Sequence, residues 1–285
     1  MHSCPVCESA FRLGRPPWLL RCAECGFRAS TLAEQIASPH AHEIIDEHTR
    51  SGALSHLRER NFRAILRVLG RLRERRGRLL DVGCAHGWFL RAAHADRWQV
   101  VGIEPDLEMA RVAAEAGNDV RPGVFPAALS RNEKFDAITF HDVFEHLPDV
   151  NAALVSCREA LVRRGLLVIN LPDARGPFFR LALALASFGI HRPLERLWQK
   201  NFPSPHLSYF TAPLLRRLAL KHGFHPVYGA RLPSVALRGL WSRLRYDRTA
   251  GVFGSAVVFL GVCLLLPMLR LLPPDISLEI FEFKH

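Results

Sequence analysis

Four cysteines near the beginning of the chain have the spacing of a metal site. They form two C-x-x-C pairs, Cys4 with Cys7 and Cys22 with Cys25, and fourteen residues separate the pairs. Two such pairs on tight turns can place four thiolates around one tetrahedral zinc ion. Few apolar residues lie nearby, so we expect zinc to hold residues 1–30 together as a zinc ribbon. Four thiolates leave no open coordination position, which indicates a structural ion; a redox pair or unpaired cysteines are the alternatives.

A second segment, LLDVGCAHGWFL (79–90), has the composition of a ligand-binding turn. An apolar run ends in Asp81, and Gly83 and Gly87 then frame a short turn before aromatic and aliphatic residues. Glycines at such a turn let the backbone approach a ligand closely. The turn itself reads GCAHG, so the G-x-G-x-x-G pattern of a dinucleotide site is not met.

The elements that must position this turn follow from alternating strand and helix signals. Strands are expected at 79–83, 101–104, 119–124, 135–140, 165–171, 225–230 and 276–285. Helices are expected between most of them, including one through 151–163, and residues 31–76 ahead of the first strand are expected to be helical linker. This alternation predicts an α/β doubly wound sheet with ligands outside the carboxyl ends of its strands.

The acid before the first glycine carries a resemblance to a known family. D-x-G-x-G-x-G after a first strand resembles motif I of class I S-adenosylmethionine (SAM) dependent methyltransferases, with Ala85 in place of the middle glycine. In that family the turn lies against the methionine part of SAM, and the acid matched by Asp81 lies near the methionyl amine. The resemblance implies that Gly83, Cys84, Ala85 and Gly87 contact the cofactor.

Glu104 provides a separate test of this interpretation. It ends the second strand, within VVGIEPD, where a carboxylate can accept hydrogen bonds from both ribose hydroxyls. Alone it would be interpreted as a solvated acid; together with motif I the ribose role is favoured. No acid clearly follows the third strand to meet the adenine amine, so Phe125 or backbone near 123–126 is expected to line that part of the pocket.

The resemblance extends over residues 77–230. FDAITFHDVFEHLPDVNAAL, REALVRRGLLVINLPD and PHLSYFTAPLLRRLALKHGF resemble segments of the branch that includes ubiquinone-biosynthesis-type methyltransferases, although Arg163 and Arg164 replace a usual proline and glycine. Many members of this branch begin with a four-cysteine zinc ribbon. The implied fold is a Rossmann-like seven-stranded sheet over 77–285, in which the seventh strand, ISLEIFEFKH (276–285), is antiparallel and lies between the fifth and sixth.

Histidines are the first candidates for a base, because a hydroxyl acceptor benefits from a group with a near-neutral pKa. SAM already carries an activated methyl group, so the protein must mainly align the acceptor and exclude water. His141 follows the fourth strand, and His206 with Tyr209 is the expected pair for acceptor contact. Asp142 is a candidate for the cofactor side of the pocket.

His146 has two further interpretations. We favour a structural role in which it ties a helix to a loop. A metal site formed with Glu145 is disfavoured, because adjacent residues on a helix point in different directions.

Net charge leaves the partner open. The formal charge is +11 and the pI is near 10, which favours anionic partners or simply a basic enzyme surface. The arginines of 54–78 lie between apolar residues at helical spacing, and a solvated helix face is favoured over phosphate contact. No secretory signal opens the chain, so we expect a cytoplasmic protein.

Two apolar insertions, at about 174–205 and 241–274, suggest a membrane surface. The first contains the mostly apolar stretch 178–190, and the second contains 251–269, nineteen residues without a charge. That length is near the ~20 residues that a span requires. A re-entrant or in-plane segment at the inner face of a membrane is favoured; a single crossing or packing on the protein itself are the alternatives.

Together these features favour a SAM-dependent methyltransferase that O-methylates a lipid-linked or amphipathic small molecule at a membrane face. An RNA base methyltransferase with a zinc ribbon is the first alternative, because the ribbon, the arginines and the charge fit it. A non-catalytic SAM-binding scaffold is the second.

Overall fold

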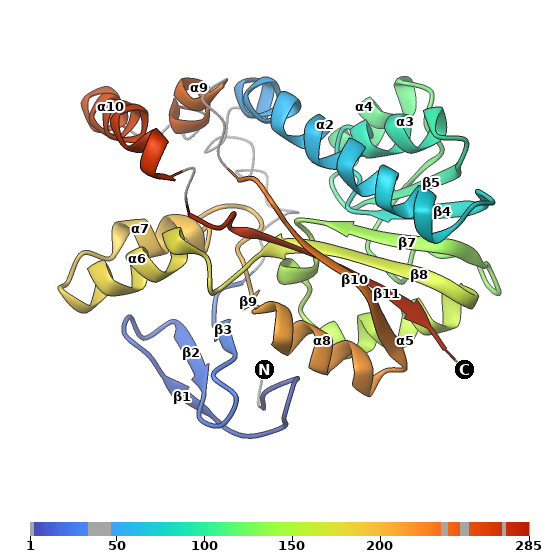
Figure 1. Cartoon of the computed structure of the whole chain (residues 1–285), viewed down its shortest axis with the longest axis horizontal. Coiled ribbons are helices and arrows are strands. Elements are labelled where there is room, and N and C mark those ends of the chain that lie inside the picture. Colours follow the sequence, from blue (N-terminus) through green and yellow to red (C-terminus); the bar gives the residue numbers. More distant parts are fainter. Residues whose placement is uncertain (1–2, 34–46, 235–238, 246–250, 270–271, 285) are drawn as a thin grey trace.

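The computed structural model describes residues 3–33, 47–234, 239–245, 251–269 and 272–284 (Figure 1). Segment 34–46 of the expected helical linker lies outside the described residues, as do 246–250 and 270–271 of the second apolar insertion.

A seven-stranded sheet forms the centre of the molecule. Its strands run in the order β10-β11-β8-β7-β4-β5-β6, and β11 pairs antiparallel with both of its neighbours. The prediction that the last strand lies between the fifth and sixth is confirmed. The strands are β4 (Arg78–Val82), β5 (Gln99–Glu104), β6 (Val120–Pro122), β7 (Phe135–His141), β8 (Leu161–Pro172), β10 (Phe224–Leu232) and β11 (Ile276–Phe283).

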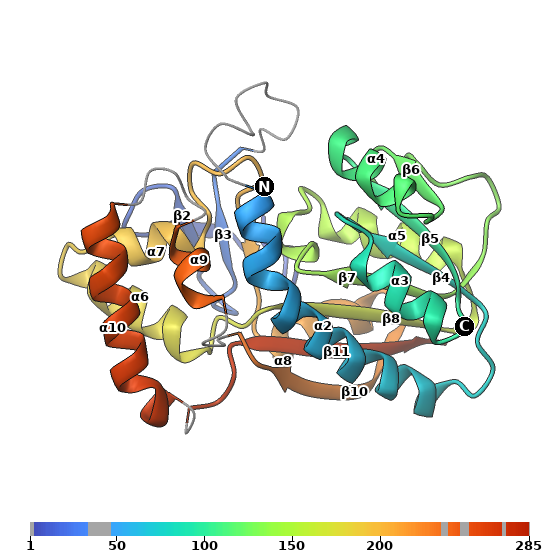
Figure 2. The same ribbon diagram turned by 90° about the horizontal axis from the view of Figure 1, so that it is seen from above.

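Helices cover both faces of this sheet (Figures 1 and 2). One face carries α2 (Glu47–Leu72), α3 (Trp88–Ala95) and α4 (Leu107–Glu115), and the other carries α5 (Val150–Ala160) and α8 (Ala212–Lys221). Side chains alternate along each strand, so Leu166 and Val168 pack with α2 and α3 while Leu167 and Ile169 pack with α5 and α8. Both faces are therefore buried, as a largely parallel sheet requires.

The helix expected through 151–163 was predicted too long. It ends at Ala160, and Leu161 already pairs with Phe135 in the sheet. Residues 161–164 form the beginning of the twelve-residue strand β8. The helix ends where Leu161 pairs with Phe135 in the sheet, and hydrophobic periodicity cannot reveal such a pairing.

The N-terminal unit is a small antiparallel sheet that the rest of the chain completes. Strands β1 (Phe11–Leu13), β2 (Leu19–Cys22) and β3 (Arg28–Ser30) are joined by β9 (Ser208–Tyr209), in the order β1-β2-β3-β9. Gly26 has a φ of 74°, which the turn after the second cysteine pair requires. No pattern in the sequence predicts the fourth strand, because two residues are too few to show a period.

The two apolar insertions form helices at the same end of the molecule in both views (Figures 1 and 2). They are α6 (Pro177–Ser187) with α7 (Arg192–Leu197), and α9 (Leu240–Arg245) with α10 (Val252–Leu269). Within the described parts of the chain, no helix combines the length and apolarity that a membrane crossing requires. The single-crossing alternative also required a last strand outside the main sheet, whereas β11 lies inside it.

An ion pair with one buried partner ties α8 to β11. Arg216 donates from Nε to Glu279 Oε2 at 2.7 Å and from Nη2 to Oε1 at 3.1 Å; the Glu279 side chain is only 2% exposed, whereas that of Arg216 is 44% exposed. Arg216→Ala would leave this carboxylate with Ser277 as its remaining side-chain donor. We expect a loss of about 2 kcal/mol in the free energy of unfolding, measured by urea denaturation, because water reaches the carboxylate only in part.

The matched control is Arg164→Ala, which removes an exposed pair with Glu282 at 3.4 Å. It should change the free energy of unfolding by less than about 1 kcal/mol. Equal losses of unfolding free energy in the two variants would contradict a larger contribution from the pair of Arg216 and Glu279.

Candidate functional site

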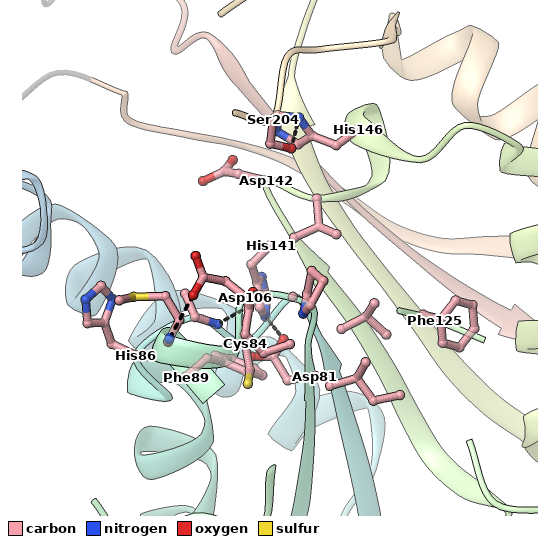
Figure 3. A pocket seen from close by; sticks show the side chains of 18 of the residues that line it. Asp81, Cys84, His86, Phe89, Asp106, Phe125, His141, Asp142, His146 and Ser204 are labelled. Atoms are coloured by element: carbon pink, nitrogen blue, oxygen red, sulfur yellow. Dashed lines mark hydrogen bonds and ion pairs between the residues drawn. The ribbon is translucent and has the colours of Figure 1, made fainter. Parts of the chain in front are cut away.

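A cavity of about 520 Å³ opens at the carboxyl ends of β4, β5 and β7. Figure 3 shows Asp81, Cys84 and Phe89 at one end of it and Asp142, His146 and Ser204 at the other. Of the predicted cofactor residues, Asp81, Gly83, Cys84, Ala85, Glu104 and Asp142 line this cavity, whereas Gly87 is not among its lining residues. The doubly wound topology therefore brings them together where ligands are expected.

The turn after β4 has an unusual backbone. Gly83, Ala85 and Gly87 all have positive φ, at 70°, 45° and 69°. A Cβ on Gly83 would lie 2.6 Å from Val143 Cγ2, and one on Gly87 would lie 2.7 Å from Asn118 Nδ2. Both glycines are thus required by conformation and by space, and Ala85 adopts a left-handed conformation that costs an L-residue free energy.

Glu104 holds this turn in place. Its Oε2 accepts from the N–H of Ala85 at 2.8 Å, and its Oε1 accepts from the N–H of Asp106 at 2.9 Å. The side chain lies at the end of β5 and is almost completely buried. A carboxylate can accept further hydrogen bonds, so a ribose contact remains available to it.

Asp81 is a buried acid at the bottom of the cavity. Thr139 donates to its Oδ1 at 2.8 Å, and His141 Nε2 lies 3.9 Å from the same oxygen. Burial, with a smaller contribution from the Glu104 charge, raises the pKa of Asp81 to about 8. A cation bound beside it would favour the carboxylate form.

His141 lies on the cofactor side of the cavity and packs between aromatic rings. Its ring centroid is 4.1 Å from that of Phe89 and 5.2 Å from that of Phe62, and Nδ1 contacts Asn170 Oδ1. Burial lowers its pKa to about 4, which makes it a weak base at neutral pH. Its predicted catalytic role stays a prediction.

Asp142 follows at the end of β7 with a φ of 55°. Its Oδ1 accepts from Asn170 Nδ2 at 3.2 Å. A non-glycine residue in this conformation at the edge of a cavity is a common feature of functional sites.

Two groups of cavity residues were not predicted from the sequence. Arg58 and Phe62 reach the cavity from α2, and Trp88 from the beginning of α3. The arginines of 54–78 were interpreted as a solvated face, yet Arg58 lies over the Trp88 ring at 5.9 Å. The position of Arg58 among apolar residues was the sequence signal that could have predicted its contact with the cavity.

The second group comes from the first apolar insertion. Gln199, Phe202, Pro203 and Ser204 line the side of the cavity opposite the turn, next to His146. No motif marks this segment, and its position depends on packing between elements far apart in the chain. Phe125, expected near the adenine, also lines the cavity.

His206 and Tyr209, the predicted acceptor pair, are buried directly behind this wall. The His206 ring lies 4.7 Å from that of His146 and 5.5 Å from that of Tyr209, and its Nε2 contacts Gln199 Nε2 at 2.9 Å. Burial lowers the pKa of His206 and raises that of Tyr209. In these positions the two side chains pack behind the cavity wall. Their catalytic roles remain predictions.

Glu145, His146 and His206 form a compact buried group. Their ligating atoms lie within 4.8 Å of one another, and neither carboxylate oxygen of Glu145 has a hydrogen-bond partner among the described residues. Burial, then the Asp142 charge, raises the pKa of Glu145. The expectation that Glu145 and His146 point apart was wrong: both lie on the 3-10 turn Phe144–His146, and one ligating atom of each still lies within 4.8 Å of the other and of His206. The group could hold a divalent cation.

The four predicted metal ligands also converge. The Sγ atoms of Cys4, Cys7, Cys22 and Cys25 lie within 4.8 Å of one another. Cys4 and Cys25 are 3.5 Å apart, and Cys7 and Cys22 are 3.3 Å apart. Tetrahedral Zn–S bonds of about 2.3 Å place sulfurs about 3.8 Å apart, so this arrangement fits a zinc ion with little adjustment.

Comparison with known families gives one match over most of the chain. The model of a family described as "Methyltransferase domain" matches residues 53–228, from α2 through the strand β10. The matched range contains every predicted cofactor and catalytic residue and leaves out the four cysteines.

Curated relatives include enzymes named ubiquinone biosynthesis O-methyltransferase. That of Bradyrhizobium sp. (strain ORS 278) is 31% identical over 117 residues, which cover 39% of this chain and 46% of the relative. That of Cereibacter sphaeroides (strain ATCC 17029) is 26% identical over 156 residues, which cover 53% and 61%. The chain thus spans about half the length of the curated relatives it matches.

Solved structures share the fold. The cyclopropane synthase MmaA2 from Mycobacterium tuberculosis superposes with a TM-score of 0.52 at 18% identity, over 77% of this chain and 82% of that one. A SAM-dependent methyltransferase from Mesorhizobium loti has a TM-score of 0.50 at 18% identity, over 77% and 96%. At these identities the likeness concerns the fold alone.

The left-handed Ala85 generates a prediction about stability. Ala85→Gly should leave the free energy of unfolding unchanged or raise it by up to about 1 kcal/mol, because relief of the backbone strain offsets the flexibility that glycine adds to the unfolded chain. The matched control, Ala92→Gly inside α3, should lose about 1 kcal/mol. A loss at Ala85 as large as that at Ala92, measured by urea denaturation, would show that the turn carries no strain.

Proposed function

Because the chain belongs to the methyltransferase-domain family, we propose that it is a SAM-dependent methyltransferase. We further propose that it methylates an oxygen of a lipid-linked or amphipathic small molecule at a membrane face. The turn from Asp81 to Gly87, which Glu104 holds through a hydrogen bond from Ala85, is the observation that supports SAM as the cofactor.

Each part of SAM has a matching group in this proposal. Asp81 would hold the methionyl amine, the backbone of the glycine turn would contact the methionine chain, and Glu104 would accept from the ribose hydroxyls. Phe125, whose ring packs edge-on against Phe140 at 5.6 Å, would line the adenine part of the pocket. His146 and Ser204 lie on the opposite wall, where the acceptor would meet the activated methyl group (Figure 3).

The acceptor lies beside His146, with His206 and Tyr209 behind it. The carbonyl of Pro205 accepts from His146 Nδ1 at 2.9 Å, which fixes the tautomer so that Nε2 is the nitrogen able to take up a proton. A hydroxyl acceptor is supported by this histidine and by the name of the curated relatives.

Exposed apolar side chains support an amphipathic acceptor and a membrane face. On and after α6 they include Leu181, Phe188 and Ile190, and Phe188 is 83% exposed. On α10 they include Phe253, Leu260 and Leu264, and Phe253 is also 83% exposed. Surface patches of this kind commonly mark contact with a lipid or protein partner. Both helices lie at one end of the molecule, and α9 adds Trp241 and two arginines there.

Methyl transfer from labelled SAM tests the proposed function. The protein is incubated with methyl-labelled SAM and with separate membrane, lipid-extract and RNA fractions. We expect label in organic-soluble material from the membrane and lipid fractions. Label in RNA would replace this proposal with an RNA methyltransferase, and SAM binding without transfer to any fraction would favour a scaffold.

The control for this assay is Gly83→Ala, whose Cβ would meet Val143 and occupy a left-handed backbone. It should lower incorporation about tenfold or more while circular dichroism shows the native fold.

The raised pKa of Asp81 leads to a prediction about proton release when SAM binds. With its pKa near 8, Asp81 is protonated at pH 6.5 in the free protein, and a neighbouring ammonium favours its ionised form. SAM binding should therefore release up to about one proton, and affinity should rise as pH increases from 6 toward 8. Titration calorimetry in buffers of different ionisation enthalpy measures the release. Asp81→Asn should abolish it, Asp149→Asn should not, and equal release from all three proteins would refute the assignment.

A further inference from the structure

We propose that the four-cysteine ribbon is a positioning device for the acceptor side of the cavity, with Ser30 as the residue that transmits its position. Metal binding fixes β3, and β3 fixes the segment from Gln199 to Tyr209. The term "acceptor side" rests on the proposed function, whereas the physical coupling does not.

The coupling begins with hydrogen bonds between two distant parts of the chain. β3 pairs antiparallel with β9, with Arg28 opposite Tyr209 and Ala29 opposite Ser208. Ser30 extends this ladder, because its N–H donates to the Leu207 carbonyl at 3.0 Å and its Oγ donates to the His206 carbonyl at 2.8 Å. One ribbon residue thus holds two successive carbonyls, that of His206 itself and that of Leu207 directly after it.

Side-chain packing follows the same path. The completely buried Phe27 lies against Phe210, with ring centroids 4.9 Å apart. Trp18 contacts Trp198 edge-on at 5.7 Å, and Leu19 belongs to the buried cluster that contains Trp198 and Tyr209. The ribbon therefore forms part of the core beneath the cavity wall.

The segment held in this way reaches the cavity. The N–H of His206 donates to the Trp198 carbonyl at 3.0 Å, and the N–H of Leu207 donates to the Glu145 carbonyl at 2.9 Å. Ser204, on the cavity wall, contacts His146 Nδ1 at 3.1 Å. A displacement of β3 would consequently move the group of His146, His206 and Ser204.

The ribbon depends on its metal to hold β3. Its strands have only three, four and three residues, which cannot form an independent core. The turn that carries Cys22 and Cys25 also presents Phe27, whose carbonyl accepts from the Cys22 N–H at 2.8 Å. By contrast, the turn at Asp81–Gly87 is held by β5 and β7, and the ribbon makes none of the contacts described for it.

Hydrogen exchange with mass spectrometry on the full chain, with zinc and after its chelation, tests the coupling. Chelation should increase exchange several-fold in peptides covering 17–33 and 198–210. Exchange in 79–90 and 101–106 should stay unchanged, the Kd for SAM should change less than twofold, and added zinc should reverse the increase.

A variant that keeps the cysteines separates the coupling from the fold of the ribbon. Ser30→Ala should retain zinc yet increase exchange at 206–208 several-fold, and Ser30→Thr, which keeps the hydroxyl, should restore protection. The matched control is Ser156→Ala, which removes a hydroxyl that donates to the Ala152 carbonyl at 3.0 Å on α5. It should leave 206–208 unchanged.

Two results would overturn the proposal. In one, chelation increases exchange in the ribbon while 198–210 stays protected. In the other, 79–90 loses protection together with 198–210, so that the metal stabilises the whole protein and no particular side of the cavity. Neither readout uses an acceptor, so failure to find methyl transfer would leave this test intact. Once an acceptor is known, Ser30→Ala should raise its KM several-fold without changing that of SAM.

Discussion

The carboxylate of Glu104 is the constraint on which the cofactor half of the site depends. It joins the end of β5 to the turn that follows β4, because it accepts from Ala85 on one strand's loop and from Asp106 on the other's. The turn needs this anchor, since three of its residues have left-handed backbones. The buried Asp81 lies just before this turn, inside β4, where Thr139 of β7 holds it.

The two halves of the cavity are built by different means. The cofactor half is local to three neighbouring parallel strands, and its residues come from the ends of β4, β5 and β7. The opposite half is assembled from a 3-10 turn and an insertion that packs on the N-terminal sheet. A protein organised in this way can keep one cofactor site while the other wall varies, which suits a family whose members differ in acceptor.

The two halves of the cavity differ in how well the sequence predicts them. The seven-stranded sheet, the inserted β11 and the clustering of Asp81, Gly83 and Glu104 could be predicted, because each depends on local patterns within a known topology. Arg58 and Ser204 could not, since they reach the cavity through packing between distant segments. The convergence of Glu145 and His146 with His206 was missed for the same reason, because His206 comes from a distant segment; in addition, the adjacent residues Glu145 and His146 were expected to point apart.

The position of β11 has a consequence for how the chain folds. Among the seven strands of the sheet, this one follows all the others in sequence, yet it lies inside the sheet, between β8 and β10. Until it is synthesised and inserted, β8 presents an open apolar edge and β10 has no partner in the sheet. The pairing also joins residues more than a hundred positions apart, which makes closure slow compared with local structure. During synthesis, the half-built sheet is therefore the state most exposed to aggregation, and chaperones that bind open strand edges would act on it first.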